Sequence, residues 1–126
     1  MSKKPAKVVQ GAIVRGYNIP DEFGRNPKDR FLLVISPMVS ISNDTEFLTV
    51  AITTKTYSIP DGFGVSIPHH NPGSGFNRTG LTEPCNAHVG WRPLIKFDDV
   101  LRVAGTCPVR VLDEVIRRIE AINKLP

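Results

Sequence analysis

Apolar residues recur at the spacing of an α-helix in only one convincing place, near the C-terminal end of the chain. Five of them form a single stripe: Leu112, Val115, Ile116, Ile119 and Ile122. Pro108 precedes the stripe and suits the first helical position, where an N–H would have no partner. The opposite face pairs Asp113 with Arg117 and Glu114 with Arg118 at i, i+4, which predicts a solvated surface. This helix must therefore bury its apolar stripe against the rest of the fold.

The remainder of the chain consists of short runs of β-branched and aliphatic residues, separated by Gly, Pro, Asn and Ser. These runs predict strands at residues 8–15, 31–35, 47–54, 63–67 and 100–104, and an extended segment at 79–91. Two long polar loops are expected at 17–29 and 68–78, and long loops on compact domains often carry function. Many short strands and one terminal helix predict a mainly β fold, a small barrel with the helix packed on it.

The length of 126 residues fits one domain spanning 1–126, with residues 1–7 as a flexible tail. A formal net charge of +4 permits a phosphate-rich partner. The sparse cysteines, Cys85 and Cys107, suit a reducing cytosol in which thiols stay free. No signal-type apolar core follows the N-terminus, and the longest apolar run, 31–35, is too short to cross a bilayer. We therefore expect a cytoplasmic protein without a membrane partner.

Three segments carry recognisable patterns in a fixed order. Residues 11–14 are Gly-Ala-Ile-Val, Arg30 is followed at once by an aliphatic run ending in Ser36, and residues 51–54 are Ala-Ile-Thr-Thr. In these segments the chain resembles the PemK/MazF toxins. Their corresponding patterns are Gly-x-Ile/Val-Val, Arg-Pro before an aliphatic strand, and Pro/Ala-Ile-Thr-Ser. Residues 62–67 and 79–81 are also similar to the plasmid-borne branch of the family, so the resemblance covers nearly the whole chain.

The resemblance implies an SH3-like barrel that forms a homodimer and cleaves single-stranded RNA, often at short sequences, as the toxin of a type II toxin–antitoxin system. It also implies a cognate antitoxin with an acidic, partly disordered tail that blocks the cleft. No cofactor or metal is implied. In such cleavage a 2′-OH attacks the neighbouring phosphate and leaves a 2′,3′-cyclic phosphate and a 5′-OH. The reaction needs a proton acceptor, donors for the phosphorane oxygens, and a proton source for the leaving oxygen.

The catalytic candidates are Arg30, Thr53 and His88. Arg30 stands where a loop meets a strand, and its planar fork can donate two hydrogen bonds to one phosphate. Thr53 ends an apolar strand, and its hydroxyl could bind a phosphate oxygen or orient the 2′-OH. Each residue also has an ordinary interpretation, because arginines at strand edges are usually solvated and threonine favours strands on propensity alone.

The sequence departs from the family pattern at two places. Phe31 replaces the usual proline, and the Arg-x-Asp triplet of the plasmid-borne branch corresponds here to residues 84–86, Pro-Cys-Asn. The proton acceptor is therefore unidentified. A histidine is the natural substitute near neutral pH, and His88 is preferred over His69 and His70 because it should share a strand face with Asn86. The rival hypothesis is that Asn86 and Arg30 only position the RNA.

Further polar residues are candidates for binding RNA: Arg15, Arg25, Lys28, Lys55, His69, His70, Arg78 and Asn86. Bases could stack on aromatic residues in or near the loops, namely Tyr17, Phe23, Phe76 and Trp91. The Cys85-x-x-His88 spacing hints at zinc, but the second half of a zinc motif is missing and no metal site is predicted.

Two other interpretations remain open at this stage. Gyrase-poisoning toxins of the CcdB type share the barrel and resemble one another in a C-terminal Trp-Gly-Ile ending. This chain instead ends in residues 123–126, Asn-Lys-Leu-Pro, and its one tryptophan is internal, which weighs against that function. The chain could also be an SH3-like adaptor that binds a peptide, or a family member without activity, since the Arg-x-Asp triplet is missing.

Overall fold

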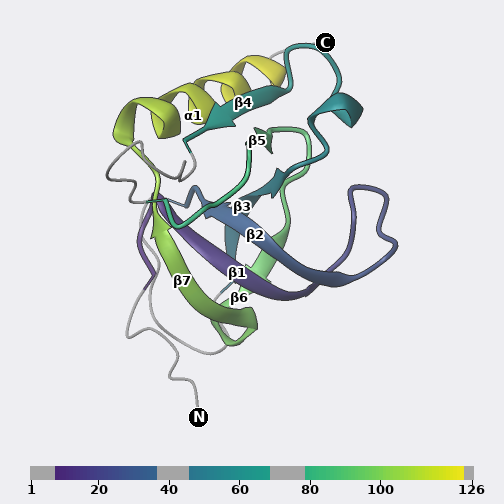
Figure 1. Cartoon of the computed structure of the whole chain (residues 1–126), viewed down its shortest axis with the longest axis vertical. Helices are drawn as coiled ribbons and strands as arrows, with labels where there is room; N and C mark the ends of the chain where they lie inside the picture. Colours follow the sequence, from purple (N-terminus) through teal and green to yellow (C-terminus); the bar gives the residue numbers. More distant parts are fainter. Residues whose placement is uncertain (1–7, 37–45, 69–78, 124–126) are drawn as a thin grey trace.

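The computed structural model describes residues 8–36, 46–68 and 79–123. Within them, seven strands and one α-helix follow in the order β1 (Ala12–Ile19), β2 (Lys28–Val34), β3 (Glu46–Thr53), β4 (Gly64–Ile67), β5 (Cys85–His88), β6 (Leu94–Lys96), β7 (Val100–Thr106) and α1 (Val109–Asn123). Two 3₁₀ turns, η1 (Thr56–Ser58) and η2 (Phe97–Asp99), connect strands. Figure 1 shows the antiparallel sheet crossing the molecule below α1.

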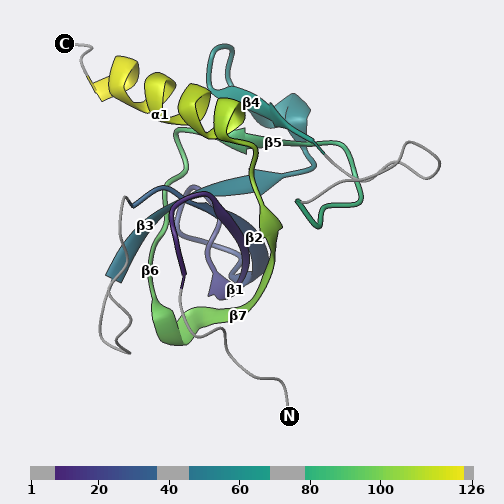
Figure 2. The same ribbon diagram turned by 90° about the vertical axis from the view of Figure 1, so that its left-hand side faces the viewer.

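The strand order in the sheet is β4-β5-β3-β2-β1-β7, and β6 pairs with β3 outside this path. Besides β2, strand β3 pairs with two other strands along its length. Glu46 to Leu48 pair with β6, and Ala51 to Thr53 pair with β5. Register shifts in β1, against both β2 and β7, allow the sheet to curl. In Figure 2, α1 lies over β4 and β5 at one end, and the curled strands β1, β2 and β7 lie at the other.

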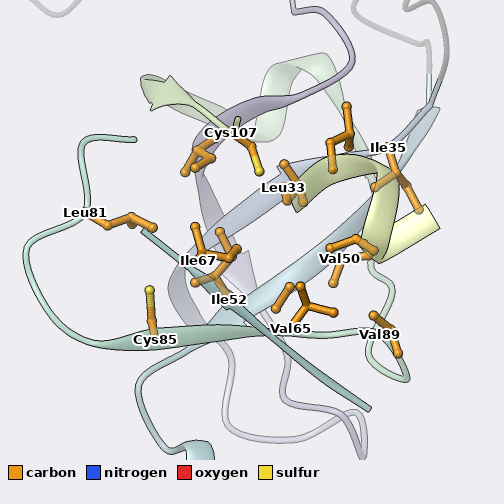
Figure 3. Packing of buried hydrophobic residues seen from close by; sticks show 14 of the residues in the cluster. Leu33, Ile35, Val50, Ile52, Val65, Ile67, Leu81, Cys85, Val89 and Cys107 are labelled. Carbon is orange, nitrogen blue, oxygen red and sulfur yellow. The ribbon is translucent and has the colours of Figure 1, made fainter. Parts of the chain in front are cut away.

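Successive residues of the central strands face two separate hydrophobic cores. The pair Ile13 and Leu33 belongs to the core beneath α1, and the neighbouring pair Val14 and Leu32 belongs to the core inside the curled strands. Strand side chains alternate between faces, so a strand buried on both faces needs a continuous apolar run. This explains the uninterrupted run at 31–35. Figure 3 shows the first core, with side chains of several strands converging.

The C-terminal helix is confirmed. It begins directly after Pro108, and Leu112, Val115 and Ile119 are buried in the first core. One of the predicted surface pairs forms, with Arg118 Nε 3.1 Å from Glu114 Oε1. The other prediction is wrong, because Arg117 reaches Glu114 at i, i+3 in place of Asp113. Glu114 therefore forms ion pairs with both Arg117 and Arg118.

Several predicted boundaries differ from the structure. Strand β1 continues to Ile19 and β2 begins at Lys28, so the loop expected at 17–29 is confined to residues 20–27. Asn18 adopts φ 55° at the register shift, a left-handed conformation that asparagine tolerates, and this lets the strand continue past its polar residues. Strand β6 was not predicted, because only Ile95 of its three residues is buried and no alternation is visible. The predicted tail at 1–7 and most of the 68–78 loop lie outside the described residues.

Both cysteines are free, as expected, and the structure places both of them in buried positions. Burial, with a smaller contribution from the nearby Glu83 charge, raises the pKa of Cys85 to about 11. Burial also raises the pKa of Cys107 to about 11. Both side chains belong to the first core (Figure 3). Over the described part of the chain, no helix combines the length and the apolar character needed to span a membrane.

Candidate functional site

A cleft of about 680 Å³ opens between the β1–β2 loop and the turn that follows β3. In Figure 1 this loop and η1 project on the same, right-hand side of the view. The cationic lining residues are Arg15, Lys28, Arg30 and Lys55, and the acidic ones are Asp21, Glu22, Asp29 and Glu83. The cleft therefore combines hydrogen-bond donors that suit an anion with carboxylates that can accept a proton.

Arg30 lies at this cleft and holds the β1–β2 loop in place. Its Nε donates to the carbonyl of Ile19 at 2.8 Å, and Nη2 donates to the carbonyl of Asn26 at 2.9 Å. The guanidinium carbon lies 4.9 Å from the centre of the Trp91 ring. A guanidinium has five N–H groups, and within the described residues only these two have partners. Arg30 is thus fixed in orientation and still has donors for a bound anion.

Thr53 ends β3 beside the strand that carries Arg30. The register pairs Leu32 with Ala51, so Arg30 and Thr53, each two residues beyond that pair, lie at matching positions of neighbouring strands. Thr53 Oγ1 accepts a hydrogen bond from the backbone N–H of Lys55 at 3.0 Å. Because the hydroxyl oxygen is the acceptor in this bond, its own proton remains available for a ligand oxygen.

His88 lies beneath the cleft wall, in contact with Glu22. Their side chains are 6% and 27% exposed, and His88 Nε2 is 2.7 Å from Glu22 Oε2. Nδ1 accepts a hydrogen bond from the Gly90 N–H at 3.2 Å, which places the ring proton on Nε2. Nε2 makes no well-aligned hydrogen bond, so the Glu22 contact is an ion-pair contact when the imidazole is protonated. Glu22 lines the cleft and His88 does not.

Aromatic rings fix the position of His88. The rings of Phe63 and Trp91 approach it edge-on, with centroid distances of 6.4 Å and 6.3 Å. Trp91 also contacts Arg30, so one indole ring lies against both the buried imidazole and the guanidinium. The arginine and the Glu22–His88 pair therefore belong to one packed unit.

Two of the remaining carboxylates are used to build the β1–β2 loop. Asp21 accepts hydrogen bonds from the backbone N–H groups of Phe23 and Arg25 and from the Asn26 side chain. The backbone bond from Arg25 is the main cause that lowers the pKa of Asp21. Asp29 Oδ1 accepts a hydrogen bond from the Asn18 N–H at 3.1 Å. Within the described residues, Glu83 has no ion-pair or hydrogen-bond partner.

The structure brings together five of the residues singled out from the sequence, since Arg15, Lys28, Arg30, Thr53 and Lys55 line one cleft. The aromatic residues Phe23 and Trp91 line it too. Glu22 and Glu83 also line the cleft, and neither was among the residues singled out from the sequence. No local pattern distinguishes these acids from ordinary surface residues, because their position depends on tertiary packing.

Other candidates lie elsewhere. Arg25 is on the same loop, with its guanidinium 5.5 Å from the Phe23 ring centre, but it does not line the cleft. Asn86 is half-buried opposite Thr53 on β5 and does not line it either. Tyr17 lines a separate hollow. The remaining candidates fall outside the described residues: His69, His70, Phe76 and Arg78.

The Cys85 and His88 side chains point to opposite faces of β5, because they are three residues apart on a strand. Cys85 belongs to the core beneath α1, whereas His88 contacts Glu22. They therefore cannot share a metal ion in this arrangement. Across residues 8–36, 46–68 and 79–123, no three or more His, Cys, Asp or Glu side chains gather as a metal site would require.

Neither a protein-family model nor a curated protein matches the sequence. Solved structures do match the fold. A chain of the MazE–MazF crystal structure (Form-II) from Deinococcus radiodurans aligns with a TM-score of 0.63 and 16% identity, over 99% of this chain and 100% of that chain. An endoribonuclease in complex with its cognate antitoxin, from Mycobacterial species, aligns with a TM-score of 0.58 and 15% identity, over 99% of this chain and 98% of that chain. The chain has the MazF fold, and the predicted fold class is confirmed.

Proposed function

We propose that this protein is a MazF-type toxin, an endoribonuclease that binds single-stranded RNA in the cleft and cleaves it without a metal ion. The observation that carries the proposal is the placement of Arg30 and Thr53 at matching positions of β2 and β3, within one cleft lined by further cations. The whole-chain similarity in fold to a MazE–MazF complex and to an antitoxin-bound endoribonuclease supports it.

In the proposed reaction the 2′-oxygen attacks the adjacent phosphorus and the bond from phosphorus to the 5′-oxygen breaks. The 2′ proton passes to a base, and the departing 5′-oxygen gains a proton, so the products carry a 2′,3′-cyclic phosphate and a 5′-OH. Negative charge grows on the non-bridging oxygens. The free N–H groups of Arg30 and the free O–H of Thr53 stabilise it, because fixed donors aimed at developing charge lower the barrier.

The proton acceptor in this proposal is the Glu22 carboxylate. It lines the cleft, whereas His88, the residue proposed from the sequence, is buried behind it. His88 therefore acts through Glu22: its Nε2 lies 2.7 Å from the carboxylate, and this contact limits the positions that the carboxylate can take. General-base assistance of this kind contributes about 10²–10⁴-fold in rate. In this scheme His88 is a positioning residue.

The proposed partner is an antitoxin whose acidic, partly disordered tail occupies the cleft. Arg15, Lys28 and Lys55 line the cleft and favour an anionic segment over a basic one. Of the two matching structures named above, one is a MazE–MazF structure and the other is an endoribonuclease in complex with its cognate antitoxin. A tail bound in this way would compete directly with RNA.

The test is to incubate the purified protein with a long single-stranded RNA in the presence of EDTA. The expected result is discrete fragments with 5′-OH ends, which polynucleotide kinase labels without prior phosphatase treatment. A matched duplex RNA serves as the resistant control. Intact single-stranded RNA would contradict the proposal, and intact RNA together with arrested DNA supercoiling would support a gyrase poison in its place.

A further inference from the structure

A second, smaller hollow of about 250 Å³ adjoins the cleft. It shares four lining residues with the cleft, namely Phe31, Ile52, Thr54 and Glu83. Leu81 and Cys85 add to its apolar wall. We call this hollow the side pocket. Figure 3 shows Leu81 and Cys85 on the same side of the core cluster. Burial and the Glu83 charge keep the Cys85 thiol protonated at neutral pH, so the wall is uncharged there.

The surroundings of Phe31 favour a nucleotide. The guanidinium carbons of Arg15 and Arg102 lie 4.6 Å and 5.7 Å from the centre of its ring. Arg15 pairs with Phe31 on β2 and with Arg102 on β7, so the three residues form a row across neighbouring strands. Neither arginine has an ion pair within the described part of the chain. A nucleotide whose base lies in the side pocket would place its phosphate near these two arginines, which have no ion pair among the described residues.

Glu83 limits which base fits. Its carboxylate lines the pocket and has no partner in the described regions. An ionised carboxylate only accepts hydrogen bonds, so it favours a base with an exocyclic amino group. Uracil has a carbonyl oxygen where cytosine has its amino group, and that oxygen would face the carboxylate without a proton between them.

We propose that the side pocket binds one nucleobase of the RNA and that Glu83 selects an amino-bearing base over uracil at that position. The inference rests on the proposed function, since it assigns the occupant to an RNA strand bound in the cleft. Glu83 determines specificity in this scheme and takes no part in bond cleavage.

The test measures binding separately from cleavage. Fluorescence anisotropy would compare 2′-O-methyl oligocytidine and oligouridine of equal length, which cannot be cut because the nucleophile is blocked. The wild-type protein is expected to bind oligocytidine about tenfold more tightly, the size of one good polar base contact. Glu83→Gln should bring the ratio close to one, because its amide can also donate to the uracil oxygen. Glu120→Gln, an equal charge change on the exposed face of α1, should leave the ratio unchanged.

Thr82→Phe provides a second variant, because Thr82 is exposed at the pocket and a ring there would fill it. It too should abolish the preference. Equal binding of both oligonucleotides by the wild type, or a ratio unaffected by Glu83→Gln, would overturn the inference. The EDTA cleavage assay runs in parallel. Cleavage without a base preference would support the ribonuclease function and contradict the base-binding pocket. A base preference without cleavage would support the pocket and contradict the ribonuclease function.

Discussion

Glu22 Oε2 lies 2.7 Å from His88 Nε2, and this contact joins the β1–β2 loop to the interior of the sheet. Only the glutamate lines the cleft. The imidazole of His88 is buried, whereas the carboxylate of Glu22 faces the cleft. This arrangement favours the carboxylate as the base that meets the substrate and the imidazole as the group that orients it. The proposed catalytic roles of the two residues follow from this difference in exposure.

The first prediction concerns this pair. Glu22→Gln removes the proposed proton acceptor and should lower cleavage by about 10²–10⁴-fold. His88→Gln should reduce the rate by a smaller factor than Glu22→Gln, because the carboxylate that accepts the proton is still present. A Glu22→Gln variant that cleaves RNA at the wild-type rate per folded molecule would exclude Glu22 as the base.

The second prediction concerns Arg30. Arg30→Ala should reduce cleavage by about 10²-fold or more, because it removes the main donor to the phosphorane. Arg30→Lys keeps the charge but loses the fork, so it should restore only part of the activity. Arg110→Ala, an exposed arginine on α1, is the control. Since Arg30 also binds the carbonyls of Ile19 and Asn26, rates must be compared per folded molecule.

The third prediction concerns the Thr53 hydroxyl. Thr53→Val keeps the β-branch and should cause a marked loss of activity with a small change in thermal midpoint. The lost hydrogen bond from Lys55 is worth about 1 kcal/mol. Thr53→Ser retains the hydroxyl and should keep most of the activity. If Thr53→Val lowers stability while activity per folded molecule is unchanged, Thr53 is structural only.

The parts of the fold that the sequence predicts are those in which local pattern and burial coincide. Leu112, Val115 and Ile119 recur at helical spacing and are buried together. The run at 31–35 is continuous because β2 is buried on both faces. Strand β6 has only Ile95 inside, so no period can be recognised. Asn18 looks like a loop residue but extends β1 through a left-handed conformation.

The same distinction applies to the cleft. Arg30 and Thr53 could be selected because each lies in a segment that resembles the PemK/MazF pattern, next to an apolar run that is visible in the sequence. Glu22 could not, because its proximity to His88 depends on a contact between residues far apart in the chain. The face that His88 shares with Asn86 was predicted from strand alternation, but its burial behind Glu22 depends on how the β1–β2 loop folds back.

The fourth prediction concerns assembly. Strands β4 and β7 are the two ends of the main sheet path, and exposed strand edges are available for pairing with a second chain. We expect a symmetric homodimer. Sedimentation should give about twice the 13.9 kDa monomer mass. A clean monomer at micromolar concentration would contradict this expectation.

The last prediction uses the two buried thiols. Because burial raises the pKa of Cys85 and Cys107 to about 11, thiol reagents should react slowly with the native protein at neutral pH and at full rate after denaturation. Glu83→Gln should speed labelling of Cys85 alone, since the Glu83 charge contributes only to that shift. Mass spectrometry of labelled peptides separates the sites.

The raised thiol pKa values also fix the sign of a stability change with pH. Unfolded thiols ionise near their ordinary pKa of 9.0, whereas the folded ones stay neutral until about 11. Their contribution to stability is therefore complete below pH 9.0 and is lost as the pH rises towards 11. The denaturant midpoint should fall over that interval. Cys107→Ala should make the decrease of the denaturant midpoint with pH shallower. An identical decrease in the variant and the wild type would show that other groups cause the pH dependence.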